Sequence, residues 1–201
     1  LTEYLYRDFP VVVAAVVLVT YFLLLITFRS VVLPLKAVVM NVLSLFASYG
    51  ALAAVFQDGL FAGLPGPFAV APLGYVEATL PILLFCTLFG LSMDYEVFLL
   101  SRMREVYLAT GENGRAVAAG LQGSGRVITG AAAIVVAVAG SFAVTADVVQ
   151  IKALALGIAI AVLVDATIVR ALVVPATMRL LGHWNWWLPA PLRRLLPPEV
   201  S

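Results

Sequence analysis

Charged residues, cysteine and histidine are all scarce in this sequence of 201 residues. Only 11% of the residues are charged and 63% are hydrophobic, whereas a soluble domain carries roughly 25% charged residues. The net charge of +1 provides no basic field that would attract nucleic acid. The one cysteine, Cys86, excludes a disulfide within the chain, and we expect it to be a small apolar packing residue. Neither a metal nor a cofactor is expected.

Long apolar runs make up most of the sequence. A membrane-spanning helix needs about 20 mostly apolar residues. Five runs reach that length, at residues 10–28, 31–56, 79–100, 127–145 and 149–181. The sequence therefore predicts an all-α membrane protein, with a bundle of about five transmembrane helices over residues 1–181.

Two polar segments accompany the spans. Residues 101–126 are expected to form an amphipathic linker on the membrane surface, with Gly120 and Gly123 as part of a hinge. Residues 182–201 are expected to form an interfacial tail, because the run HWNWW at 183–187 is typical of an aromatic belt.

Basic residues gather on one side of the predicted bundle. They follow the first, third and fifth spans, which alternation places at the same face: Arg29, Lys36, Arg102, Arg104, Arg115, Arg126, Arg179, Arg193 and Arg194. Only Arg7 and Lys152 fall on the opposite side, so the positive-inside rule predicts that the side with nine basic residues is cytoplasmic.

The chain begins without methionine or a signal peptide, and we expect it to be a piece of a longer polypeptide.

An acidic residue, Asp94, interrupts the third span. A charge at the centre of a membrane helix costs about 2.5–3.5 kcal/mol on insertion scales, so this carboxylate must face protein or water, or take up a proton. Gly90 lies on the same helix face and leaves room for a neighbour, while the Tyr95 phenol offers a link in a hydrogen-bonded proton chain. Ser92 belongs to the same motif. A proton relay is favoured over an acid that only fixes helix packing.

Three more ionisable residues, Glu96, Asp165 and Arg170, lie well inside the third and fifth spans. Glu96 and Arg170 have similar depths in the third and fifth spans, which predicts an interhelical pair unless each side chain reaches the headgroups separately. Asp165 lies midway along the fifth span. Arg170, five residues further on, is about 140° away around an α-helix and is a poor partner for it. A proton relay and a structural hydrogen bond remain equally open for Asp165.

The second span carries a polar stripe. Asn41, Ser44 and Ser48 recur at intervals of three and four residues, so they share one helix face. Interhelical hydrogen bonds are the favoured interpretation, and the lining of a transport path is the alternative.

Four stretches of the chain resemble the MmpL proteins of the resistance-nodulation-division (RND) superfamily of transporters. They are GLSMDYEVFLLSRMRE (90–105), GRVITGAA (125–132), LVDATIVRALVVPA (163–176) and LLGHWNWWLPAPL (180–192). The resemblance covers nearly the whole chain, and the stretches occur in the expected order.

This resemblance implies a fragment of a twelve-helix transporter of the bacterial inner (plasma) membrane, namely its last five spans. Family members use the proton gradient to export lipids and other amphiphiles. Asp94 and Tyr95 match the relay pair of the second half and would face a similar pair in the N-terminal half. The implied partners are membrane lipids, a hydrophobic or lipid-like substrate, protons and that N-terminal half, but no nucleic acid. Gly90, Ser92, Glu96, Asp165 and Arg170 are expected to support the relay.

Two other classes compete with a transporter. A non-transporting sterol-sensing-like domain is compatible with the same sequence. An intramembrane aspartyl protease also has two acids on two spans. Its motifs, however, are Tyr-Asp on one span and Gly-x-Gly-Asp on the next. Here the order is Asp94-Tyr95, and Leu163-Val164 precedes Asp165. We therefore expect no enzyme activity.

Overall fold

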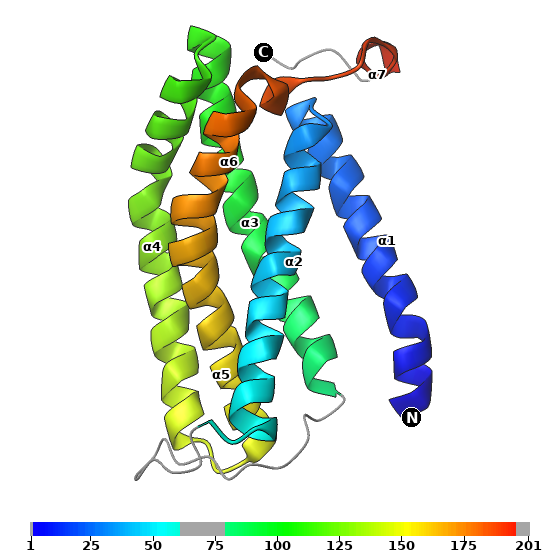
Figure 1. Cartoon of the computed structure of the whole chain (residues 1–201), viewed down its shortest axis with the longest axis vertical. Coiled ribbons are helices and arrows are strands. Elements are labelled where there is room, and N and C mark those ends of the chain that lie inside the picture. Colours follow the sequence, from blue (N-terminus) through cyan, green and yellow to red (C-terminus); the bar gives the residue numbers. More distant parts are fainter. Residues whose placement is uncertain (1, 61–78, 196–201) are drawn as a thin grey trace.

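The structure, a computed structural model, describes residues 2–60 and 79–195, and these residues form a bundle of long helices (Figure 1). The elements are α1 (Thr2–Phe28), α2 (Val32–Leu52), η1 (Ala53–Gln57), α3 (Thr79–Thr110), α4 (Asn113–Thr145), α5 (Val149–Val164), η2 (Asp165–Val173), α6 (Val174–Leu181), η3 (Gly182–Trp186) and α7 (Ala190–Leu195). Segments η1 and η2 are π-helical and η3 is a 3₁₀ turn. Within the described residues five helical stretches are long and apolar enough to cross a membrane, which confirms the predicted five-span bundle.

The polar region after the third span differs from the prediction. Residues 101–126 do not form a separate linker, because they are the end of α3 and the beginning of α4, joined by a tight turn at Gly111 with φ of 69°. Its four Arg and four Ala residues favour a helix, which continues through this region although it also contains five Gly residues. Gly120 is no hinge either. A Cβ atom there would collide with the Met103 side chain and lie 3.3 Å from the Met103 nitrogen, so glycine allows α3 and α4 to pack closely.

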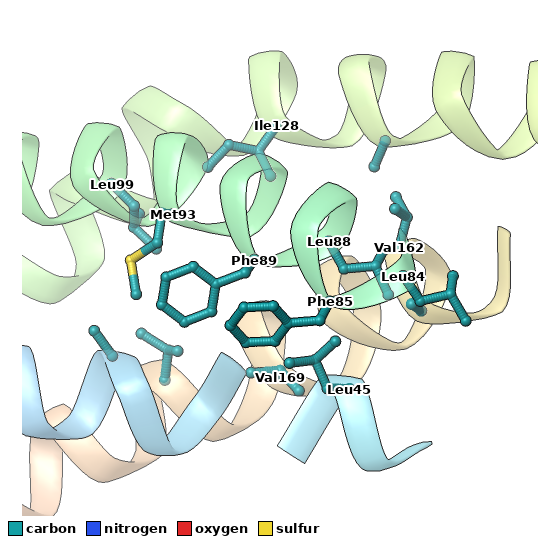
Figure 2. Packing of buried hydrophobic residues seen from close by; sticks show 14 of the residues in the cluster. Leu45, Leu84, Phe85, Leu88, Phe89, Met93, Leu99, Ile128, Val162 and Val169 are labelled. Carbon is teal, nitrogen blue, oxygen red and sulfur yellow. The ribbon is translucent and has the colours of Figure 1, made fainter. Parts of the chain in front are cut away.

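Buried apolar side chains from α2, α3, α4 and η2 meet in the middle of the bundle (Figure 2). The rings of Phe85 and Phe89 on α3 stack at 5.2 Å, and Leu45 of α2 and Val169 of η2 lie beside them. Because lipid is as apolar as these side chains, their close packing rather than exclusion of water stabilises the bundle. Cys86, predicted to be a small apolar packing residue, is exposed on α3 and does not pack inside this bundle.

Helix α1 lies at the edge of the bundle (Figure 1). It contacts α3 through an edge-on pair of rings, Phe9 and Phe85, whose centroids are 5.7 Å apart. Pro10 lies inside α1 and not at its start, because the helix extends back to Thr2. Much of the α1 surface is exposed and apolar, as expected for a helix that faces lipid.

The segment after α6 folds back onto the end of the bundle. The Asn185 side-chain amide is fully buried and donates hydrogen bonds to the carbonyls of Met178 and Gly182, both at 2.7 Å. The backbone carbonyl of Asn185 accepts a 2.6 Å hydrogen bond from the Ser30 hydroxyl in the α1–α2 turn. The Trp187 carbonyl accepts a further bond from the backbone of the same turn.

The same segment also contacts the α3–α4 turn. The Trp186 indole stacks on Tyr107 with 4.4 Å between centroids and donates to the Asn113 side chain at 3.0 Å. Trp184 and Trp187 remain about half exposed, as an interfacial belt requires. Residues 196–201 of the predicted tail lie outside the described residues. The tail therefore joins both hairpin turns, so the ends of α1, α3 and α6, which carry most of the basic residues, lie together (Figure 1).

Candidate functional site

The last span changes from α-helix to π-helix at Asp165. In the widened turn, residues five apart share a face, and the Val174 N–H bonds to the Val169 carbonyl five residues back. Pro175 follows directly. Proline has no N–H and its ring clashes with the carbonyl four residues earlier, so a regular α-helical ladder cannot pass through it. The π-helical segment brings Arg170 onto the same face as Asp165.

Asp165 and Arg170 form a buried ion pair between Oδ2 and Nη2, with 6% and 5% of each residue exposed. The prediction that Arg170 is a poor partner for Asp165 is wrong, because it assumed α-helical spacing. Two hydroxyls complete the site. Ser44 of α2 donates to Asp165 Oδ1 and Ser92 of α3 donates to Oδ2, each at 3.3 Å. Both carboxylate oxygens are thus satisfied from three helices, as a buried charge requires.

Arg170 also contacts the helix that carries the relay motif. Its Nη2 atom donates to the Ser92 carbonyl at 3.2 Å. Its guanidinium carbon lies 5.3 Å from the centre of the half-buried Tyr95 ring, within the range of a cation–π contact. Tyr95 therefore faces the ion pair.

Glu96 makes no hydrogen bond or salt bridge to Arg170, so the predicted close pair is absent, although the two groups interact electrostatically. It is buried, but its Oε1 atom has no hydrogen-bond partner among the described residues. The reason is that the π-helical turn commits the Arg170 guanidinium to Asp165 and Ser92.

Two side chains of α2 share this condition. Lys36 Nζ and Asn41 Nδ2 are buried and lack a hydrogen-bond partner among the described residues. Lys36 nevertheless interacts electrostatically with Glu96. The charge pattern predicts Lys36 on the cytoplasmic side, but its burial was not predicted. Its position four residues into α2 was the available signal. Buried polar groups of this kind are usually satisfied by ordered water or by another polar group.

The polar stripe of α2 makes interhelical contacts. Ser48 donates to the Gly157 carbonyl of α5 at 2.9 Å, and Ser44 donates to Asp165. The favoured interpretation of the stripe is therefore confirmed for both serines. Asn41 lies on the same face but leaves its amide without a described partner.

Asp94 lies apart from this buried cluster. Its side chain is exposed, together with Gly90 one turn earlier, and a Cβ added to Gly90 would meet nothing within 4 Å. The structure thus separates the two residues of the motif: Asp94 points out of the bundle, whereas Tyr95 lies under Arg170. Asp94 and Asp165 do not share a site, which argues against the arrangement of an aspartyl protease.

The site brings several ionisable and hydroxyl groups into the membrane-spanning part of the bundle. It combines an exposed carboxylate, a phenol beside a guanidinium, and a buried acid with two hydroxyl donors. Among the described residues no cluster of histidine, cysteine and carboxylate side chains could hold a metal ion.

Five apolar spans around a buried acid–arginine pair define a multi-pass α-helical membrane protein. Residues 1–197 match the model of the MMPL family, and the chain belongs to this family.

Three relatives illustrate the range of the family. The chain is 49% identical over 182 residues to a putative membrane protein of Streptomyces coelicolor, covering 90% of the chain and 25% of that protein. It is 45% identical over 188 residues to the heme uptake protein MmpL11 of Mycobacterium tuberculosis, covering 94% and 19%. It is 40% identical over 195 residues to the trehalose monomycolate exporter MmpL3 of Mycolicibacterium smegmatis, covering 95% and 18%. The chain thus spans a quarter or less of the length of these relatives.

Membership of this family confirms the resemblance seen in the sequence and favours a transporter over an enzyme. The names of the relatives describe lipid export in one case and heme uptake in another.

Proposed function

We propose that the complete protein is a transporter of the bacterial inner membrane that uses the proton-motive force to export lipids or other amphiphilic molecules. Asp94 and Tyr95 form its proton relay. The lipid substrate is supported by the name of the MmpL3 relative, a trehalose monomycolate exporter, which is 40% identical to this chain.

The observation that carries this proposal is the exposure of Asp94 on an apolar helix. A carboxylate that faced lipid at this depth would cost about 2.5–3.5 kcal/mol or more, so another protein surface or a water-filled cavity must cover it. Gly90, one turn away, leaves space for a close approach. The N-terminal half of the same transporter is the partner that fits this surface.

The relay works through a change of charge on Asp94. A proton that enters neutralises Asp94 and removes its attraction for cations. Tyr95, the next residue, lies under Arg170, and Arg170 is shared between Asp165 and the Ser92 carbonyl. Protonation at Asp94 therefore changes the field at a guanidinium that links α3 to the last span. This link couples proton uptake to movement of the helices.

The proposal is tested with the complete gene product in proteoliposomes made from native bacterial lipids. An imposed proton gradient should drive proton entry with wild-type protein. Asp94→Asn, which keeps the shape but cannot ionise, should reduce that entry at least about hundredfold, as expected when a positioned acid–base group is lost. Tyr95→Phe should impair it less, because only one hydroxyl is lost.

Asp147→Asn is the matched control, since Asp147 is an exposed acid in the α4–α5 turn. It should leave proton entry unchanged. Normal proton entry with correctly inserted Asp94→Asn protein would contradict the relay assignment. A wild-type protein that carries no protons would instead favour the sterol-sensing-like alternative.

A second candidate, inward transport of heme, is favoured by the 45% identity to a heme uptake protein. The same proteoliposomes distinguish the two directions. Accumulation of external heme inside the vesicles would support uptake, and movement of labelled lipid between leaflets would support export.

A further inference from the structure

A pocket of about 330 Å³ lies where the α1–α2 turn, α3 and the C-terminal tail meet. Arginines form one part of its wall: Arg29, Arg104 and Arg193. Aromatic and apolar side chains form the rest, chiefly Tyr107, Trp186 and Leu188. The described residues that line the pocket carry three positive charges and no negative one.

The three arginines come from three different elements. Arg29 occupies the α1–α2 turn with a left-handed backbone, φ of 47°. Arg104, on α3, donates from Nη1 to the Thr27 carbonyl at 2.7 Å, which holds its side chain against the same turn. Arg193 is on α7, beyond the segment that docks on the bundle end. Only the folded tail brings the three guanidinium groups around one cavity.

The other wall is rigid and apolar. Tyr107 and Trp186 stack with an interplanar angle of 10°, and the Trp186 indole is tied to Asn113. Leu188 is buried beside them at 7% exposure. A molecule that fits this pocket therefore has an anionic part and a less polar part next to it.

The pocket is lined from the α1–α2 turn and from the tail, so it lies at the end of the spans. Trp184 and Trp187 of the same tail are half exposed, as residues of an interfacial belt are, which points to headgroup depth. Basic pockets at helix ends on the cytoplasmic side bind the headgroups of anionic lipids. Guanidinium groups suit a phosphate because they donate in a planar fork.

We propose that this pocket binds the phosphate headgroup of an anionic glycerophospholipid from the cytoplasmic leaflet. The three arginines hold the phosphate, and the Tyr107–Trp186 pair and Leu188 contact the glycerol and the first part of the acyl chains. The bound lipid then fastens the tail to the α1–α2 hairpin. This site is separate from the relay, so its function does not depend on the proposed proton transport.

The test uses the complete gene product, purified in detergent, and native mass spectrometry with phosphatidylglycerol or phosphatidylethanolamine. Wild-type protein should retain one phosphatidylglycerol in preference to phosphatidylethanolamine. Each arginine near a lipid phosphate contributes about fivefold to affinity. The triple variant Arg29→Gln, Arg104→Gln, Arg193→Gln should therefore bind at least about tenfold more weakly.

A matched triple variant changes the same charge on the same side outside the pocket, with Arg115→Gln, Arg126→Gln and Arg179→Gln. It should bind phosphatidylglycerol like the wild type. Asp94→Asn should also bind normally, which separates this proposal from the relay. If the pocket triple fails to fold, the double variant Arg29→Gln, Arg193→Gln leaves the Arg104–Thr27 bond in place and should lose binding about tenfold or more.

Three results would overturn the proposal. The first is an equal loss in both triple variants, which indicates general charge attraction. The second is equal retention of phosphatidylethanolamine. The third is displacement of the lipid by inorganic phosphate at equal concentration, which indicates a site for a free anion.

Discussion

Asp165 accepts hydrogen bonds from side chains on three separate helical segments, Ser44, Ser92 and Arg170. The spacing of residues within the last span cannot predict these partners, since Ser44 and Ser92 are 121 and 73 residues away from Asp165 in the chain. The sequence did identify Asp165, Arg170 and Ser92 as candidates, because polar residues inside spans are costly. The sequence did not predict which of these residues pair with one another. Glu96 and Arg170 matched in depth, but depth alone does not say which way a side chain points.

Asp165 and Arg170 should behave as one unit in unfolding experiments. Asp165→Asn or Arg170→Gln alone strands a buried charge and should destabilise the protein by about 3–5 kcal/mol. The double variant should lose less than the sum of the two, with a coupling of about 1–3 kcal/mol. Thermal unfolding of the purified complete protein measures each value.

A second cycle with Glu96→Gln and Arg170→Gln provides the control. Its coupling should be smaller than that of the first cycle, since Glu96 makes no hydrogen bond or salt bridge to Arg170 and interacts with it only electrostatically. Strong coupling in this cycle, together with additivity in the first, would contradict the geometry of the site.

The helical segment η2 decides which residues of the last span share a face. The residue that causes this π-helical segment is Pro175, ten residues after Asp165 in the sequence. A proline there predicts a disturbed ladder in the preceding turn, but several distortions are possible, including a kink without a π-helical turn. The packing of Asp165 and Val169 inside the bundle selects the one that is present.

Pro175→Ala should uncouple the ion pair. Alanine restores the N–H donor, so the segment can return to α-helix and gain up to about 3 kcal/mol of local helix stability. That change rotates Arg170 away from Asp165. The coupling between the two residues should fall below about 0.5 kcal/mol in the double-variant cycle. Pro10→Ala, inside α1 and far from the site, should leave the coupling unchanged. An unaltered coupling in Pro175→Ala would show that Pro175 is not the cause of the π-helical segment.

The α3–α4 hairpin offers a test with opposite signs. Gly120→Ala places a Cβ against Met103 and should destabilise the protein by about 1–3 kcal/mol. Gly123→Ala meets nothing within 4 Å and should stabilise the helix by up to about 1 kcal/mol. The midpoint of thermal unfolding should thus fall for the first and rise for the second. Equal shifts would contradict the close contact of Gly120 with Met103.

At the scale of the whole molecule, the charge pattern predicts how the bundle sits in the membrane. The α1–α2 turn, the α3–α4 turn and the tail all meet at one end, as the alternation of five spans requires. Most of the nine basic residues lie toward this end, and the positive-inside rule predicts that it is cytoplasmic.

Cysteine labelling tests this orientation in intact cells. Asp58→Cys and Arg115→Cys are placed singly on a Cys86→Ala background, since Cys86 is itself exposed. A membrane-impermeant maleimide should label the first from outside and the second only after the membrane is opened. Labelling of both from the same side would rule out the predicted topology.

The sequence by itself determined the class of the protein, its five spans and their alternation, because these follow from run length, hydropathy and the distribution of charge. It also determined which residues are chemically unusual: Asp94, Glu96, Asp165 and Arg170. Only the tertiary structure decided how they are paired, because the face of a helix depends on the local ladder and on what packs against it. The π-helical turn before Pro175 pairs Asp165 with Arg170. The orientation of α3 places Tyr95 beside this pair and Asp94 on the outer face of the bundle.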